Sequence, residues 1–225
     1  KGCDQAEVGM IPCGSGNDFI KIIGNPAGYS DMDKQISAPS RAVDTLWIGE
    51  RMVSLNITNI GVDADAAHYM SRIKRISFMS GKMSYHLGVL LAALKPLGKE
   101  LSLRFDDGET VSGKFMLTAI CNGKIYGGGY MAAPQAQPDD GLLDVCLVRK
   151  MSRLKMAQLI EIYKNGRHLV DERLKPYIVY RRCRWVELTS PKPFRLCNDG
   201  EIFEAESTRF EIKPGSLKFI VPDNP

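Results

Sequence analysis

Three short stretches of the sequence combine small, hydroxyl and acidic residues in spacings that suit phosphate chemistry. The first is the Gly-Ser-Gly-Asn-Asp run from Gly14 to Asp18, which follows an apolar segment, Val8 to Pro12, that is typical of a strand. If a helix comes next, its free backbone N–H groups and its dipole favour an anion such as phosphate at this turn, and Asn17 and Asp18 can cap it. The competing interpretation is an ordinary strand-to-helix turn.

The second stretch lies in the middle of the chain. Tyr126 to Tyr130 contains three consecutive glycines, which allow either close approach of a ligand or a flexible turn. Pro138 to Asp144 then places three carboxylates around a turn, and its carbonyl groups could join them in binding a hard cation such as Mg²⁺. A solvated Asp-Gly turn before a strand is the alternative.

The third stretch is Asp199-Gly200-Glu201, with one carboxylate on each side of a glycine. Both could point into one cleft, where one of them could take the proton from a substrate hydroxyl. A hairpin turn would explain the same residues. Asp107 to Glu109 repeats the tripeptide between two expected strands and is interpreted as a turn only, although spacing alone does not separate the two copies.

These stretches must be held by regular elements, and the pattern predicts an α+β fold. A short helix from Phe19 to Gly24 follows the first turn, and a Pro- and Gly-containing linker over 25–40 places a domain boundary near Ser40. Residues 1–40 are therefore expected to be a fragment of an α/β domain with a sheet layer of its own. Residues 41–225 are expected to form a β-sandwich.

Alternation of apolar residues and turn signals locates the elements of the second unit. Helices are predicted at Asp63–Arg75, Lys82–Leu94 and, with Ser152 as N-cap, up to Lys164; strands at Ala42–Ile48, Met52–Ile60, Leu101–Phe105, Val111–Cys121, Leu143–Val148, Tyr177–Arg181, Trp185–Thr189, Thr208–Lys213 and Leu217–Val221.

Composition excludes several functions. The chain has 225 residues, 44% of them hydrophobic, and a net charge of +4 without a long basic run, so we expect a folded protein that binds no nucleic acid. Six widely spaced cysteines indicate reduced, intracellular thiols. No apolar run approaches the about 20 residues that span a bilayer, so membrane contact is expected to be peripheral and the location cytoplasmic.

Taken in order, these stretches resemble the diacylglycerol kinase catalytic family, which includes bacterial soluble lipid kinases and sphingosine kinases. The resemblance extends from one end of the chain to the other. The matching segments are Ile11–Phe19, Asn56–Ala64, Gly81–Tyr85, Cys121–Gly129, Ala133–Ala136, Asp139–Asp144 and Asp199–Glu201.

The resemblance implies a Rossmann-like nucleotide domain, related to those of NAD kinases and phosphofructokinases, followed by a β-sandwich, with the active site between them. In this chain the second domain is expected to be complete and the first to be represented by its last strand, turn and helix. The family's GGDGT nucleotide loop is expected upstream of Lys1, and the chain as written is expected to be inactive without it.

The same resemblance implies roles for the first turn. Ser15 would contact ATP through its hydroxyl, in a loop shaped by Gly14, Gly16, Asn17 and Asp18. The implied reaction is in-line transfer of the ATP γ-phosphoryl group to a lipid hydroxyl, with a catalytic Mg²⁺ that accompanies ATP.

Further roles follow for the acidic turns. Glu201 would be the general base, and Asp199 would orient or support it. A structural Mg²⁺ would be held by the Asp140 carboxylate and by the carbonyls of Gln137 and Leu142.

Diacylglycerol at a membrane surface is the expected acceptor. Two alternatives stay open: an NAD kinase-like nucleotide kinase, and a non-catalytic lipid-binding module. Exposed edges of the sandwich could also pair in a homodimer.

Overall fold

Strands dominate the computed structural model, which describes residues 6–14, 16–73 and 97–222. They are β1 (Glu7–Val8), β2 (Ser40–Ile48), β3 (Met52–Ser54), β4 (Ile57–Gly61), β5 (Lys99–Phe105), β6 (Thr110–Cys121), β7 (Ile125–Tyr126), β8 (Tyr130–Met131), β9 (Leu143–Arg149), β10 (Ile178–Cys183), β11 (Trp185–Asn198) and β12 (Glu201–Ile220). Within the described residues, ten of them form one sheet, and β7 and β8 form a separate two-stranded ribbon. The predicted β-rich, sandwich-like second unit is confirmed.

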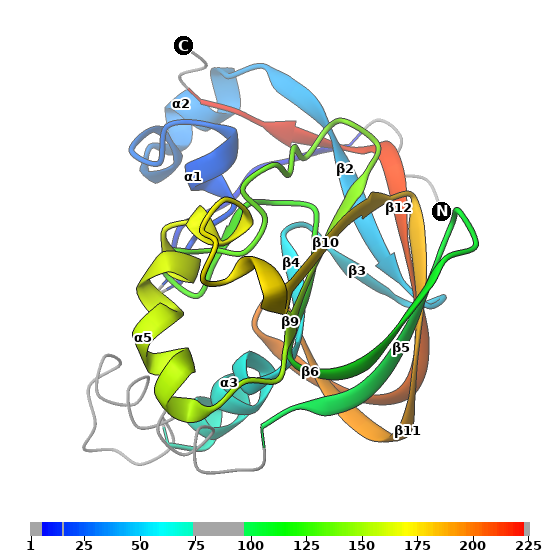
Figure 1. Ribbon diagram of the computed structural model, residues 1–225. Helices are drawn as coiled ribbons and strands as arrows, with labels where there is room; N and C mark the ends of the chain where they lie inside the picture. Colours follow the sequence, from blue (N-terminus) through cyan, green and yellow to red (C-terminus); the bar gives the residue numbers. More distant parts are fainter. Residues whose placement is uncertain (1–5, 15, 74–96, 223–225) are drawn as a thin grey trace.

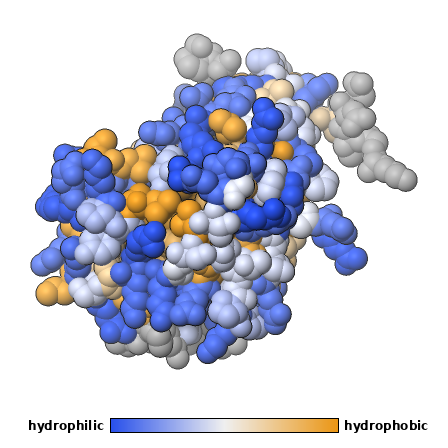
Figure 2. Space-filling model, turned by 45° about the vertical axis from the view of Figure 1, so that its right-hand side comes forward, coloured by the Kyte–Doolittle hydropathy of each residue, from blue (hydrophilic) through white to orange (hydrophobic). Residues whose placement is uncertain are grey.

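The large sheet curls on itself because two long strands each pair with the same two partners. The first half of β6 pairs with β5 and its second half with β4, and β11 pairs with β5 and then β4 in the same way. Figure 1 shows how the sheet curls. Buried side chains from eight of its strands form the main hydrophobic core. The outer surface carries mostly hydrophilic side chains, as Figure 2 shows for one face. Alternation along half-buried strands produces this division.

Helices cover the remaining apolar surfaces. They are α1 (Ile20–Ile23), α2 (Met32–Ser37), α3 (Val62–Ile73) and α5 (Arg153–Lys164), with 3₁₀ turns η1 (Gly28–Ser30), η2 (Arg167–Leu169) and η3 (Lys175–Tyr177). α5 packs Leu159 and Tyr163 against the outer face of β6 and β9 and begins, as predicted, at Ser152, whose side chain accepts a hydrogen bond from Lys155 N. Among the described residues, no helix is long and apolar enough to cross a membrane.

The N-terminal segment shares a core with one end of the sheet. Phe19 of this segment packs edge-on against Phe219, with ring centroids 5.2 Å apart, and Tyr29 is buried beside the same ring. β1 pairs in parallel with β12 (Figure 1). The prediction of a separate sheet layer for this segment is therefore wrong: its short strand extends the large sheet, although β2 does begin at the predicted boundary, Ser40.

Two predicted strands differ in extent from the observed ones. Met52–Ile60 is split into β3 and β4, because the backbone N–H groups of residues 55–57 bond to a side chain and not to a neighbouring strand. β11 continues through a register shift around two prolines to Asn198. The predicted helix Lys82–Leu94 lies outside the described residues.

The predicted strands Thr208–Lys213 and Leu217–Val221 are one strand in the structure, β12, with a bulge between them. Its register against β2 shifts between Lys213 and Leu217. Gly215 has a φ of 56°, which favours glycine, and its N–H donates to Asp44 Oδ1 at 2.7 Å. A side chain of β2 therefore holds the bulge.

Asp44 joins two segments that are far apart in the sequence. Its buried carboxylate accepts hydrogen bonds from Gly215 N and, through Oδ2 at 2.7 Å, from Gly141 N in the Pro138–Asp144 turn. Its own N–H donates to Pro138 O at 2.7 Å. The Pro138–Asp144 turn is thus attached to β2 by two hydrogen bonds, and the β12 bulge by a third.

We expect Asp44→Asn to lower the free energy of unfolding by about 1–3 kcal/mol, because the new NH₂ group faces a buried backbone donor that loses its acceptor. Urea unfolding followed by circular dichroism measures this. Asp139→Asn is the matched control: Asp139 sits in the same turn but pairs with Arg41 at the surface, where such a pair contributes at most about 1 kcal/mol. Equal losses for the two variants would contradict the role of Asp44.

Candidate functional site

The first predicted turn is closed by its own asparagine. Asn17 Oδ1 accepts a hydrogen bond from Gly14 N at 3.1 Å, and Asn17 Nδ2 donates to Gly14 O at 2.8 Å. Gly16 and Asn17 are partly buried, and Gly14 is exposed. Ser15, the residue expected to contact ATP, lies outside the described residues.

The capping prediction for this turn is wrong. α1 begins at Ile20, its N-cap is Phe19, and no side chain caps it. The side chain of Asn17 is instead hydrogen-bonded to the backbone of Gly14. A four-residue helix also has only a weak dipole with which to attract an anion. Any phosphate at this turn would therefore rely on the loop itself.

Asp18 connects the first turn to the triple-glycine loop. Its Oδ2 accepts a hydrogen bond from Gly128 N at 2.8 Å, and its Oδ1 pairs with Lys21 Nζ at 2.7 Å. The carboxylate is buried. Two stretches that are 110 positions apart in the chain are thereby brought together.

Asn56 continues the connection from the glycine loop into the sheet. Its side-chain Nδ2 donates to Ile125 O at 2.9 Å. Its backbone carbonyl accepts from Asn122 N and Gly123 N at 2.9 and 3.0 Å. A Cβ at Gly123 would lie 2.1 Å from Asn56 Oδ1, so this approach requires glycine. The loop is consequently fixed against the start of β4.

Asp199 lies at the other end of this series of hydrogen bonds. Its carboxylate accepts from Leu55 N at 2.7 Å, Asn56 N at 3.2 Å and Ile57 N at 2.9 Å. Burial raises the pKa of Asp199, and these N–H donors lower it in part. The carboxylate is therefore directed at the backbone between β3 and β4.

Glu201 stands apart from these bonds. It is the exposed first residue of β12, opposite Asn198 in the register with β11. In the part of the chain that the structure describes, no hydrogen bond or ion pair engages its carboxylate. It is thus open to a ligand from solvent, as a proton acceptor must be.

Backbone strain marks both turns. Among the described residues, the non-glycine positions with positive φ are Asn17 and Asp199, each at 46°. Asn and Asp tolerate this left-handed region better than other side chains, yet it is sparsely populated and tends to occur at functional sites. The surrounding hydrogen bonds hold both residues there.

The structure separates the two Asp-Gly-Glu copies. Asp107 only accepts a hydrogen bond from Glu109 N within its own turn, at 2.9 Å, and Glu109 pairs with Arg181 at the surface. Asp199 instead binds a backbone segment more than 140 positions away. The first copy is a turn, as predicted, whereas the second connects strands.

Asn122 joins the Pro138–Asp144 turn to the same centre. Its buried Nδ2 donates to Asp44 O at 2.9 Å and to Leu55 O at 2.8 Å. Asp44 holds that turn, and Asp199 holds Leu55. Asn56 and Asn122 belong to segments that matched the family, but nothing in their spacing predicted that both side chains would bond to backbone groups of distant strands.

In the turn expected to bind a structural Mg²⁺, both oxygens of the Asp140 carboxylate are engaged by groups of the protein. Asp140 Oδ1 accepts from Leu142 N at 3.0 Å, and Asp140 Oδ2 bonds to the Arg182 guanidinium. Gln137 is exposed and precedes Pro138, whose carbonyl is bonded to Asp44. Within the described residues, no group of three or more His, Cys, Asp or Glu side chains is placed to hold a metal.

An apolar cavity of about 60 Å³ lies between α3, α5, β6 and β9. Met116, Met156 and Leu159 are among its lining residues, and Asp63 is the one acidic group there. Burial raises the pKa of Asp63 to about 6, while the hydrogen bond from the Tyr126 hydroxyl lowers it. Tyr126 leads into the triple-glycine loop, so this cavity borders the connected turns. A larger hollow of about 530 Å³ is distant from them, on the outside of β5 and β11.

The two Asp-Gly-Glu copies provide a matched test of the Asp199 contacts. We expect Asp199→Asn to lower the free energy of unfolding by about 2–3 kcal/mol, because buried backbone donors lose a charged acceptor. Asp107→Asn should change it by less than about 1 kcal/mol, because only a local turn bond weakens. Urea unfolding measures the free energy of unfolding of both variants. A smaller loss for Asp199→Asn than for Asp107→Asn would refute the role given to the Asp199 contacts.

Comparison with known proteins agrees with this geometry. Residues 56–221 match the family model of the YegS C-terminal NAD kinase beta sandwich-like domain. A protein named "Probable lipid kinase YegS-like" from Chromohalobacter salexigens is 32% identical over 218 residues, which cover 96% of this chain and 67% of that protein. One of the same name from Shewanella frigidimarina is 28% identical over 222 residues, covering 98% and 69%.

Solved structures share the fold. A diacylglycerol kinase structure from Bacillus anthracis str. Sterne superposes with a TM-score of 0.67 at 18% identity, over 96% of this chain and 67% of that one. Another structure from the same organism gives a TM-score of 0.72 at 20% identity, with 96% and 70% covered. The resemblance to bacterial lipid kinases seen in the sequence is confirmed, and the chain belongs to the YegS-like family of lipid kinases.

Proposed function

We propose that this chain supplies the acceptor site and the general base of an ATP-dependent lipid kinase. The observation that carries the proposal is the continuous set of hydrogen bonds from Asp18 through the glycine loop and Asn56 to Asp199. It fixes the Gly14–Asp18 turn and the Asp199–Glu201 turn relative to one another. A phosphoryl transfer needs such positioning of donor and acceptor more than it needs covalent chemistry.

In this proposal, Glu201 accepts the proton of the lipid hydroxyl as the hydroxyl attacks the γ-phosphorus of ATP. Asp199 acts indirectly, by anchoring the turn that carries Glu201. Ser15, with Gly14, Gly16 and Asn17, lines the nucleotide side, and Asp18 fixes that side to the glycine loop. Mg²⁺ arrives with ATP as part of the substrate, and its charge offsets that of the phosphates.

Residues 1–40 are proposed to be the end of a Rossmann-like nucleotide domain that packs on the sandwich of residues 41–225. The curated relatives are longer, since this chain spans 67–69% of their lengths. We therefore assign turnover to the whole protein, with a GGDGT loop completing the nucleotide site, and expect none from residues 1–225 alone.

The apolar cavity favours a lipid acceptor over a soluble nucleotide. Its lining is made almost entirely of methionine and aliphatic side chains, and about 60 Å³ accommodates only a few methylene groups. We place part of one acyl chain of diacylglycerol there, with the rest remaining in the membrane surface. Contact with apolar side chains contributes about 0.8 kcal/mol per buried methylene.

The NAD kinase-like character of the matched domain favours one competing function, a nucleotide kinase. Thin-layer chromatography with labelled ATP, offering diacylglycerol and NAD to the whole protein, distinguishes the two. Labelled phosphatidic acid is the expected product. Labelled NADP with no lipid product would overturn the proposal.

Glu201→Gln in the whole protein should lower kcat by about 100-fold or more, because the amide cannot accept the proton. The melting temperature should stay unchanged, since the side chain is exposed and unbonded in the described residues. Glu206→Gln, an exposed carboxylate on the same strand, should retain activity. Equal turnover by the wild type and Glu201→Gln would remove Glu201 from the reaction.

Met156→Trp should fill the cavity and raise KM for diacylglycerol by about tenfold or more, as expected if two or more methylenes lose their contacts. The KM for ATP should not change. Leu154→Trp on the same helix is the control, since Leu154 is 71% exposed and does not line the cavity. An unchanged lipid KM in Met156→Trp would exclude the cavity as the acyl site.

A further inference from the structure

Four carboxylates gather around the Pro138–Asp144 turn, and all four are satisfied from within the protein. Asp44 accepts two backbone N–H groups, and Asp139 pairs with Arg41. Asp140 and Asp144 share a third partner, Arg182. This turn therefore already contains two cations, both of them arginine side chains.

Arg182 is placed for this role by strand pairing. It lies on β10 directly opposite Asp144 on β9, so the sheet register brings the two side chains to the same face. Its Nε is 3.3 Å from Asp144 Oδ1, while its NH2 group bonds to Asp140 Oδ2. One guanidinium thus bridges two carboxylates that are four positions apart in the chain.

The two carboxylates need a cation between them. The Asp144 side chain is fully buried, with 0% exposure, and Tyr180 donates its hydroxyl hydrogen to it. A buried carboxylate without a partner is strongly destabilising, and a second one close by adds repulsion. Either a hard metal ion or a guanidinium can neutralise the pair, and a planar guanidinium with five donors suits two carboxylates at once.

We propose that Arg182 is the internal cation of the Pro138–Asp144 turn, and that this chain folds the turn without a structural divalent metal. Mg²⁺ bound to ATP is a separate matter. The proposal concerns the turn alone, so it holds whether or not the chain belongs to an active kinase. Arg182 is a positioning residue, because it holds the turn in its observed conformation. Asp44 and Asn122 connect the turn in that conformation to the rest of the site.

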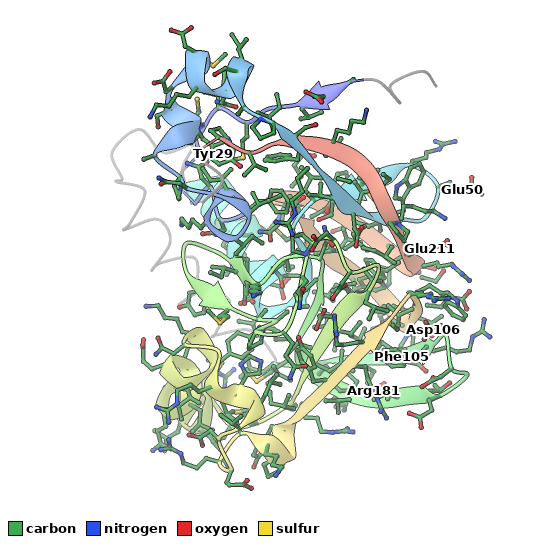
Figure 3. The ribbon with its side chains drawn as sticks, turned by 90° about the horizontal axis from the view of Figure 1, so that it is seen from above. Tyr29, Glu50, Phe105, Asp106, Arg181 and Glu211 are labelled. Carbon is green, nitrogen blue, oxygen red and sulfur yellow. The ribbon has the colours of Figure 1, made fainter. Side chains whose placement is uncertain are left out.

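The next residue provides a matched control. Arg181 points to the other face of β10 and forms a surface pair with Glu109, at 2.5 Å. Figure 3 labels it on this strand. Replacing Arg181 should lower the stability of the fold only slightly, because exposed ion pairs contribute little to the free energy of unfolding.

The first test is thermal unfolding of the 225-residue chain, by circular dichroism, with EDTA or with millimolar MgCl₂ and no nucleotide. The wild type should melt at the same temperature in both. Arg182→Gln should lower the melting temperature by roughly 6–15 °C, because the buried Asp144 carboxylate loses its cationic partner. Arg182→Lys should lower the melting temperature by less than half as much. Arg181→Gln should shift it by about 2 °C or less.

Two results would overturn the proposal in this test. One is stabilisation of the wild type by MgCl₂ that Asp140→Asn removes. The other is a loss in Arg182→Gln no larger than in Arg181→Gln.

A second measurement needs only the wild type and covers the case in which Arg182→Gln does not fold. Mn²⁺ is titrated into the nucleotide-free chain and followed by electron paramagnetic resonance. No stoichiometric binding is expected. One tightly bound Mn²⁺ per chain, released by Asp140→Asn, would show that a metal and not Arg182 neutralises the turn.

Discussion

The constraint on which the site depends is the bond between the Asp199 carboxylate and three consecutive backbone N–H groups, those of residues 55–57. These donors would otherwise need a neighbouring strand, since buried N–H groups are rarely unpaired. By accepting them, Asp199 ends β3 and allows β4 to turn away and pair with β6 and β11. The same contact fixes the β11–β12 turn, and so determines where Glu201 begins its strand.

The other connections start from this short segment. Asn56 reaches the glycine loop and, through it, Asp18, while Leu55 O binds Asn122, which also holds Asp44. Turns that lie far apart in the sequence therefore share one network of buried amides and carboxylates. The network holds distant segments together through buried hydrogen bonds that are costly to break, although the Oδ1 atoms of Asn56 and Asn122 have no hydrogen-bond partner among the described residues. Such a network suits phosphoryl transfer, in which catalysis consists largely of positioning.

The sequence predicted what is local. The spacing of apolar residues predicts α5, and the Ser152 cap requires one hydrogen bond, to the N–H three residues later. Most strands were predicted from the alternation of apolar and polar residues. The sequence did not predict the long-range contacts: Asp44 bonds to glycines 97 and 171 positions away, and nothing near Asp44 indicates either partner. The prediction of two separate strands, Thr208–Lys213 and Leu217–Val221, was wrong for this reason, since Gly215 lies in a bulge held by Asp44. The roles given to Ser15 and Glu201 came from the family resemblance and remain proposals.

The acidic residues of the three motifs other than Glu201, together with Asp44 of β2, have partners within the protein. Asp18, Asp44 and Asp199 accept backbone N–H groups, and Asp139, Asp140 and Asp144 pair with arginines. A carboxylate held in this way has its lone pairs engaged by protein groups. Glu201 alone among these motif residues has no such partner in the described chain. The motifs look similar in the sequence because all are rich in Asp, Glu and Gly, but among their carboxylates only that of Glu201 is left open in the described chain, which is a reason for proposing it as the proton acceptor.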